Sequence, residues 1–138
     1  MVRLGWPGWL IGLLLITGRA AAQDPAPALR VELGENIPNP FFPATSIPFV
    51  IHPEVCTRGH DPLVSLKIYN VLAQVIAIPV LQGQPNEVLD QIRLKCGSYV
   101  AVWDGKLLDG RSEVTPGIYY YQLMVDGQRF TRKMIARR

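Results

Sequence analysis

The feature that most constrains the fold is the dipeptide Asp126-Gly127, which separates two runs of β-branched, aromatic and aliphatic residues. Asp-Gly between such runs favours a two-residue type I′ turn, because both central residues of that turn need positive φ. Residues 115–135 are therefore predicted to form a β-hairpin in which Val125 faces Gln128. A lone hairpin is not stable in water, so the rest of the chain must cover one of its faces.

The two faces of this hairpin differ in polarity. With a two-residue turn, the pairs Leu123–Phe130 and Tyr119–Met134 lie on one face and make it largely apolar, whereas Tyr120 lies on the more polar opposite face. This is the pattern of an antiparallel sheet with one face against a core and the other toward water. The apolar face is therefore expected to contribute to the core.

The segment 23–138 shows no sustained helical periodicity and contains several short strand-like runs separated by turns. The clearest is 63–71, where Val64, Leu66 and Ile68 share one face. About seven short strands in a chain of this length indicate an all-β, immunoglobulin-like antiparallel β-sandwich. Besides the hairpin, the other expected strands are residues 29–33, 46–52, 74–81, 98–103 and a brief pairing at 92–95.

Two neighbouring segments are predicted from their prolines and polarity. Pro79 marks residues 74–81 as an edge strand, since proline cannot donate a ladder hydrogen bond. Ile76, Ile78 and Val80 are expected on one side of that strand. Residues 82–91 are polar and are expected to form a turn.

The first 22 residues have the pattern of a cleaved signal peptide. A short basic start precedes the apolar residues 4–17, and an Ala-x-Ala motif ends at Ala22. A membrane anchor is the alternative, but the apolar run is short for a bilayer span. The predicted organisation is a signal peptide at 1–22, a linker at 23–28 and one domain at 29–138. We expect an exported protein in the periplasm, at the cell surface or secreted, without membrane attachment after cleavage.

The charge of the chain argues against nucleic-acid binding. Cleavage after Ala22 would remove Arg3 and Arg19, which lowers the formal net charge of +3 by two, to +1. This balance is too weak for an electrostatic footprint on a polyanion. The remaining basic cluster, Arg132-Lys133 with Arg137-Arg138, is expected to be a solvated strand edge that discourages edge-to-edge pairing.

Two cysteines, Cys56 and Cys96, are separated by 40 positions. Export places them in an oxidising compartment, where one disulfide is the expected outcome. The alternative is a zinc site formed by His52, Cys56, His60 and Cys96, although this spacing matches no common zinc finger. A calcium site at Asp104, Asp109 and Glu113 is a further alternative, but the loop lacks the carboxylate spacing of a dedicated site. No cofactor is expected.

Five motifs in this chain resemble those of one known family. They are residues 36–47 (Asn-Ile-Pro-Asn-Pro-Phe-Phe-Pro-Ala-Thr-Ser-Ile), 64–72 (Val-Ser-Leu-Lys-Ile-Tyr-Asn-Val-Leu), 102–105 (Val-Trp-Asp-Gly), 117–123 (Gly-Ile-Tyr-Tyr-Tyr-Gln-Leu) and 131–134 (Thr-Arg-Lys-Met). In this order they resemble the immunoglobulin-like domain of the flagellar hook-capping protein FlgD. Related domains occur at the C-termini of exported bacterial proteins, close to the sorting domains of type IX secretion.

The resemblance implies a non-catalytic module, and each motif also has a structural explanation. Trp103 is expected to anchor the core, and Tyr119 or Tyr121 is a candidate corner tyrosine whose hydroxyl meets backbone. Ala73 stands where the family prefers glycine, so its turn either avoids positive φ or carries strain. The residues expected in the core are Trp103, Tyr119, Leu123, Leu66, Ile68 and Phe130.

Four functions are compatible with these features. The leading hypothesis is an exported module that binds an unknown protein partner through sheet edges or end loops, with Tyr69, Tyr120 and the basic cluster as candidate contacts. A C-terminal sorting domain for type IX secretion and a flagellar accessory role are alternatives suggested by the resemblance. A small hydrolase is the weakest, because the chain has no Gly-x-Ser-x-Gly motif and only two histidines.

Overall fold

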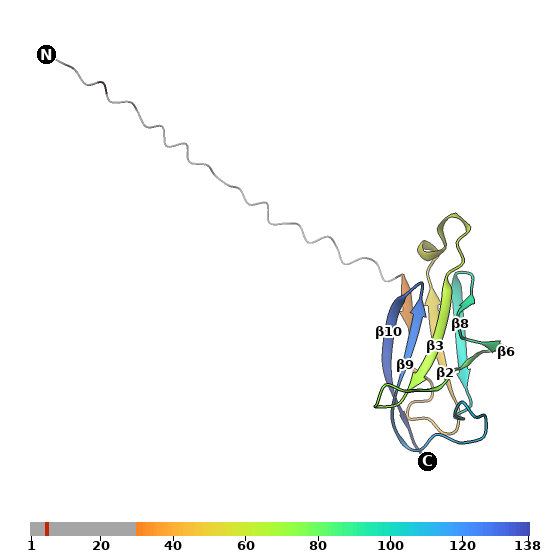
Figure 1. Ribbon diagram of the computed structural model, residues 1–138. Coiled ribbons are helices and arrows are strands. Elements are labelled where there is room, and N and C mark those ends of the chain that lie inside the picture. Colours follow the sequence, from red (N-terminus) through yellow and green to blue (C-terminus); the bar gives the residue numbers. More distant parts are fainter. Residues whose placement is uncertain (1–4, 6–29) are drawn as a thin grey trace.

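The computed structural model describes Gly5 and residues 30–138, which form two antiparallel sheets packed face to face in a β-sandwich (Figure 1). Apart from Gly5, the predicted signal peptide 1–22 and linker 23–28 lie outside the described residues. The first sheet has the strand order β1 (Val31–Leu33), β2 (Thr45–Ile51), β8 (Gly97–Trp103), β5 (Val80–Leu81) and β6 (Gln84–Val88). The second has the order β10 (Gln128–Ala136), β9 (Gly117–Val125), β3 (Leu63–Tyr69) and β4 (Val75–Ala77), and β7 (Ile92–Arg93) also pairs with β3.

The predicted hairpin is confirmed as β9 and β10. Val125 faces Gln128, and the register continues along both nine-residue strands. Asp126 has φ 47° and Gly127 has φ 83°, which are the positive values that a type I′ turn requires. Local turn chemistry therefore sets the register of the longest strand pair.

The core lies between the two sheets, and the expected core residues are confirmed with one exception. The aromatic anchor Trp103 is 2% exposed and packs against Phe41 and Tyr119, with ring centroids 5.3 and 6.5 Å away. Phe130 is only partly buried, because it lies on β10 at the edge of the second sheet. The other residues predicted for the core are all buried: Leu66, Ile68, Tyr119 and Leu123.

Two buried tyrosines donate hydrogen bonds to backbone. The Tyr119 hydroxyl lies 2.8 Å from the Thr115 carbonyl, four residues earlier, so the hypothesis of a corner tyrosine is confirmed. The Tyr121 hydroxyl donates to the Gly34 carbonyl at 2.7 Å. Tyr121 therefore links the second sheet to the segment that follows β1.

The single edge strand predicted over residues 74–81 is wrong. The chain pairs with β3 in the second sheet as β4, crosses at Ile78-Pro79, and joins the first sheet as β5. Ala77, Pro79 and Leu81 face inward, whereas Ile76, Ile78 and Val80 are only half-buried. The proline ends β4 because it cannot donate a ladder hydrogen bond.

The expected turn over residues 82–91 is also wrong in part, since it contains strand β6 and the buried Leu89. Leu89 is held by hydrogen bonds from its N–H to the Pro79 carbonyl and from the Leu66 N–H to its own carbonyl. The chain then returns to the second sheet as β7, where the predicted brief pairing at 92–95 is confirmed for Ile92 and Arg93. Together with the split of 74–81, this gives ten strands among residues 30–138 rather than about seven.

Two connections between the strands test further predictions from the sequence. A short 3₁₀ segment η1 (Pro53–Gly59) carries Cys56, whose disulfide to Cys96 confirms the predicted bridge. Ala73 has φ 60°, so its turn adopts the strained alternative. Within the described part of the chain, no helix is long and apolar enough to span a membrane.

Candidate functional site

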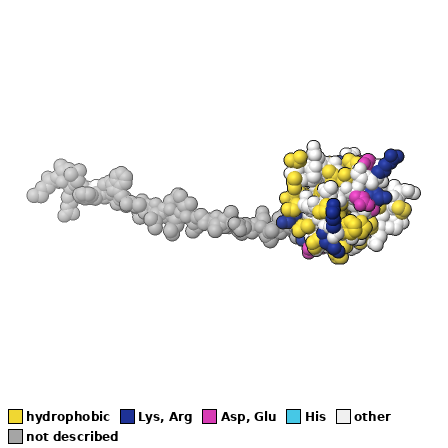
Figure 2. Space-filling model, turned by 90° about the horizontal axis from the view of Figure 1, so that it is seen from below, with side chains coloured by type: hydrophobic (Ala, Val, Ile, Leu, Met, Phe, Trp, Pro, Cys, Tyr) yellow, Lys and Arg dark blue, Asp and Glu magenta, His cyan; other side chains and the backbone are white. Residues whose placement is uncertain are grey.

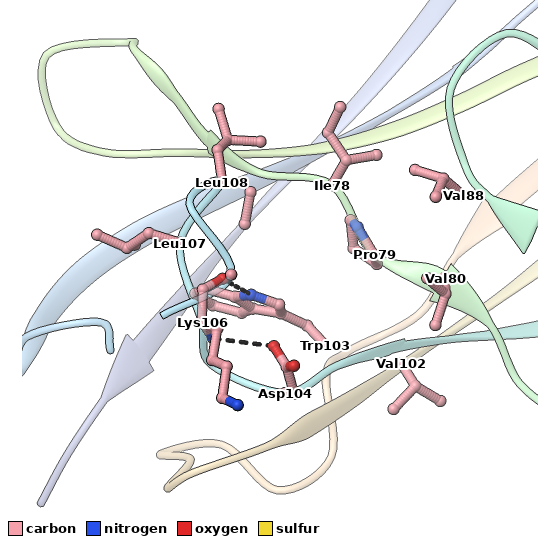
Figure 3. Close-up of a pocket in the computed structure, with 12 residues that line it drawn as sticks. Ile78, Pro79, Val80, Val88, Val102, Trp103, Asp104, Lys106, Leu107 and Leu108 are labelled. Carbon is pink, nitrogen blue, oxygen red and sulfur yellow. Dashed lines mark hydrogen bonds between the residues drawn. The ribbon is translucent and has the colours of Figure 1, made fainter. Parts of the chain in front are cut away.

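The crossing between the sheets leaves an apolar hollow of about 330 Å³ on the surface (Figure 3). It is lined by residues of β4, β5, β6 and β8, by the crossing Ile78-Pro79, and by the loop that follows β8. We call this surface the crossover hollow. Its lining residues are Ala77, Ile78, Pro79, Val80, Val88, Val102, Trp103, Asp104, Lys106, Leu107, Leu108 and Gly110.

One wall of the crossover hollow is a row of three valines. Val80 of β5 pairs with Val88 of β6 on one side and with Val102 of β8 on the other. Directly paired residues of neighbouring strands project from the same face of a sheet, so the three side chains form a continuous apolar strip. None of the three is fully buried, and Val88 is 43% exposed.

The loop after β8 forms the opposite wall. Leu108, 62% exposed, is held there because its N–H donates to the carbonyl of Ile76 at 3.0 Å. At the base of the loop, the Lys106 carbonyl accepts a hydrogen bond from Trp103 Nε1 at 2.8 Å. Figure 3 shows Ile78 and Leu108 on the same side of the hollow. The leucine is therefore positioned by backbone contacts rather than by burial of its own side chain.

The crossover hollow has little charge. Among its lining residues only Asp104 and Lys106 ionise, and Asp104 Oδ1 accepts from the Lys106 backbone N–H at 2.9 Å. Apolar surface outside a filled core is typical of sites that bind another molecule. The chemistry that this site offers is burial of apolar groups.

Exposed hydrophobic side chains also occur on the loops at the lower end of the sandwich, which Figure 2 shows from below. In that view hydrophobic side chains cover much of the end and are interrupted by a few basic and acidic groups. The loops there carry Ile37, Phe42, Leu72 and Leu108, each more than half exposed. Leu108 thus belongs both to this end and to the crossover hollow.

A second candidate surface lies on the outer face of the second sheet. Tyr69 and Tyr120, predicted separately as contact candidates, are direct partners across β3 and β9. Both line a hollow of about 370 Å³ with Gln122, Thr131 and Arg129. Asn70, Val71 and Ala73 of the β3–β4 turn complete its lining. We call this surface the tyrosine face.

The proposed zinc residues do not form a common site. Cys56 and Cys96 are joined in the disulfide, and the two histidines face different carboxylates. His60 Nε2 lies 2.7 Å from Asp126, whereas His52 Nε2 lies 3.6 Å from Glu32. In residues 30–138 no three His, Cys, Asp or Glu side chains gather to hold a metal ion.

Two of the three carboxylates proposed for calcium, Asp104 and Asp109, accept local hydrogen bonds, whereas the third residue, Glu113, is exposed and pairs with Lys106 through a backbone bridge. Asp104 accepts from the Lys106 N–H, and Asp109 accepts from the backbone N–H groups of Arg111 and Ser112. Hydrogen bonds from the Ser112 hydroxyl and from these two N–H groups lower the pKa of Asp109. The loop therefore uses Asp104 and Asp109 to form turns.

Asp126 makes hydrogen bonds to two residues that lie more than 60 positions away in the sequence. Its Oδ1 accepts from the Leu63 N–H at 2.9 Å, and its Oδ2 meets His60. Partial burial raises its pKa, but the Leu63 N–H, the hydrogen bond and charge of His60, and the charge of Arg93 together hold the pKa below its ordinary value. Asp126 thus fastens the β9–β10 turn to the start of β3.

Sequence reasoning named Tyr69 and Tyr120 of the tyrosine face but missed its other residues and the whole crossover hollow. The hollow depends on Val80 and Ile78 facing outward and on Val88 pairing with Val80. The available signal was the apolar pair Val88-Leu89 after a polar run, which is unusual for a turn.

Comparison of the chain with known protein families, curated proteins and solved structures finds no match.

Proposed function

We propose that this chain is an exported, non-catalytic immunoglobulin-like module that binds another protein in the cell envelope or extracellular space. The observation that carries the proposal is the crossover hollow. In a sandwich whose core is already filled, Val88 and Leu108 remain exposed beside Val80 and Val102. A partner that covers these side chains gains about 25 cal/mol for each Å² of apolar surface removed from water.

The immunoglobulin-like assignment is supported by the strand arrangement and by Tyr119. Two antiparallel sheets packed face to face, with a strand segment that changes sheets, are typical of this class. The Tyr119 hydroxyl closes a corner onto the Thr115 carbonyl, as in other sandwiches of the class. Export is supported by the signal-peptide pattern of residues 1–22 and by the disulfide, which fits an oxidising compartment.

The partner is proposed to contribute an extended apolar segment. Strand β6 is the last strand of the first sheet, and all five of its residues are exposed. Within residues 30–138 no strand pairs with its outer edge, which lies beside the valine strip. This arrangement lets an added strand combine backbone hydrogen bonds with side-chain pockets. Pro85 within β6 reduces the number of backbone donors, so side chains seated in the hollow would supply most of the affinity.

The experiment compares the proteins that co-purify with the native chain and with two matched variants. Val88→Asp places a charge in the crossover hollow, whereas Ile118→Asp places the same charge on the outer face of the second sheet. The two positions are 43% and 44% exposed, so both variants should fold. We expect one defined partner to be retained by Ile118→Asp and lost from Val88→Asp.

The purified partner then allows a direct measurement of affinity. Leu108→Asp should weaken binding by at least about 10-fold, the size expected for the loss of an interface anchor. Binding that both hollow variants leave unchanged would refute the crossover hollow as the interface. A catalytic turnover that depends on residues of the hollow would refute the non-catalytic assignment.

A further inference from the structure

We propose that the tyrosine face is a second binding site and that it takes an acidic polysaccharide, a chain of sugar units bearing carboxylates. It lies on the second sheet and is separate from the crossover hollow, whose lining shares no residue with it. The site combines a pair of aromatic rings, hydrogen-bonding side chains and cations. The register of three strands brings these groups together.

The aromatic platform follows from the pairing of β3 with β9. Tyr69 and Tyr120 are direct cross-strand partners, so both side chains project from the same face with Cβ atoms about 4.5–5.5 Å apart. Tyr120 is 37% exposed, and Tyr69 is half-buried. Sugar rings carry C–H groups on their faces and hydroxyls at their edges, and a tyrosine offers both an apolar ring and a polar tip.

The polar groups of the site lie on the neighbouring row. Gln122 of β9 faces Thr131 of β10, and Gln122 Nε2 donates to Thr131 Oγ1 at 3.1 Å. This hydrogen bond holds an amide and a hydroxyl in the floor of the same hollow as the tyrosines. An ordered amide and hydroxyl beside an apolar platform suit a ligand that carries many hydroxyl groups.

The cations give the site its charge preference. Arg129 and Lys133 project from β10 on the face of Tyr120, and Lys67 lies on the same face of β3. Lys67 is 3.9 Å from Asp90, but the ion pairs of residues 30–138 include neither Arg129 nor Lys133. These two exposed cations are complementary to carboxylates, which arginine binds through two parallel hydrogen bonds.

The spacing of the cations suits a polymer rather than one sugar. Arg129 and Lys133 are four residues apart on one strand, which is about 13 Å at the rise of an antiparallel strand. One sugar ring cannot bridge that distance, so the two cations would meet carboxylates on different units of a chain.

The geometry favours a polysaccharide over an acidic peptide. An extended peptide binds a sheet by pairing with a free strand edge. The tyrosine face offers no such edge at its centre, because β9 is paired on both sides by β3 and β10. The ligand is therefore held by side chains alone.

The test uses gel electrophoresis of the full-length exported chain through a matrix containing polygalacturonate, with dextran as a neutral polysaccharide and poly-glutamate as an acidic peptide. We expect retardation by polygalacturonate and little by dextran or poly-glutamate. The double variant Tyr69→Ala/Tyr120→Ala should lose at least about 10-fold in affinity, whereas Tyr69→Phe/Tyr120→Phe should retain it because the rings remain.

Two further variants keep the test decisive if the alanine variant fails to fold. Arg129→Glu changes an exposed side chain and should weaken polygalacturonate binding by at least about 10-fold. Val88→Asp, in the crossover hollow, should leave it unchanged, which separates this site from the proposed protein interface. Equal binding of poly-glutamate, binding that persists without the tyrosine rings, or no binding of polygalacturonate would each overturn the proposal.

Discussion

Replacing Ala73 by glycine should stabilise the protein. Ala73 has φ 60°, in the left-handed region where a Cβ atom crowds the following carbonyl. The turn around it is fixed by neighbouring contacts, since Asn70 Oδ1 accepts from the N–H groups of both Leu72 and Gln74 at 3.0 Å. The alanine therefore cannot relax to another conformation without breaking these bonds.

The size of the effect follows from two opposing terms. The left-handed conformation costs an alanine about 1–2 kcal/mol, and glycine does not incur this cost. Glycine loses more conformational entropy on folding, which offsets about 0.5–1 kcal/mol. We expect Ala73→Gly to raise the free energy of unfolding by about 0.5–1 kcal/mol and the Tm by a few degrees.

Urea unfolding followed by circular dichroism measures this change, with Gly83→Ala as the matched control. Gly83 has φ 79°, and a Cβ added there would meet no atom within 4 Å, so the control adds backbone strain without a clash. The control should lower the free energy of unfolding by about 1 kcal/mol. Changes of the same sign in Ala73→Gly and Gly83→Ala would refute the reasoning.

Three other perturbations test individual interactions that stabilise the fold. Replacing Cys56 and Cys96 together by serine should cost about 2–4 kcal/mol of stability in urea unfolding, and an unchanged midpoint would contradict a structural role for the bridge. Tyr121→Phe should cost about 1–3 kcal/mol because it leaves the Gly34 carbonyl without its donor, and thermal unfolding at the wild-type Tm would count against that bond. The lowered pKa of Asp126 means that its contribution is present above the unfolded-state pKa, about 4, and is lost as pH falls through the folded-state value. Asp126→Asn should therefore reduce the acid-induced loss of stability, and an identical pH profile would exclude this role.

The hairpin and most of the core could be predicted because their signals are local. Asp126-Gly127 sets the turn, and the register then follows by counting outward from Val125 and Gln128. The alternation of Val64, Leu66 and Ile68 likewise indicates the buried face of β3 without knowledge of any partner strand.

The crossover hollow could not be predicted because its position depends on which sheet each short strand joins. The sequence Ile78-Pro79-Val80 is compatible with one edge strand, and it is the pairing of Val80 and Leu81 with β8 that places β5 in the first sheet. The tyrosine face could be predicted only in part. Tyr69 and Tyr120 were identifiable as exposed aromatics, but their adjacency depends on a register between strands about 50 residues apart.

The most direct test of the proposed protein-binding role is photo-crosslinking in intact cells that produce the full-length chain. A photoreactive residue is placed at Leu108 in the crossover hollow and, for comparison, at Ser98, which is exposed on the same sheet but does not line the hollow. We expect position 108 to crosslink to one defined envelope or extracellular protein and position 98 to give no such product. Equal crosslinking from both positions, or none from position 108, would contradict the account.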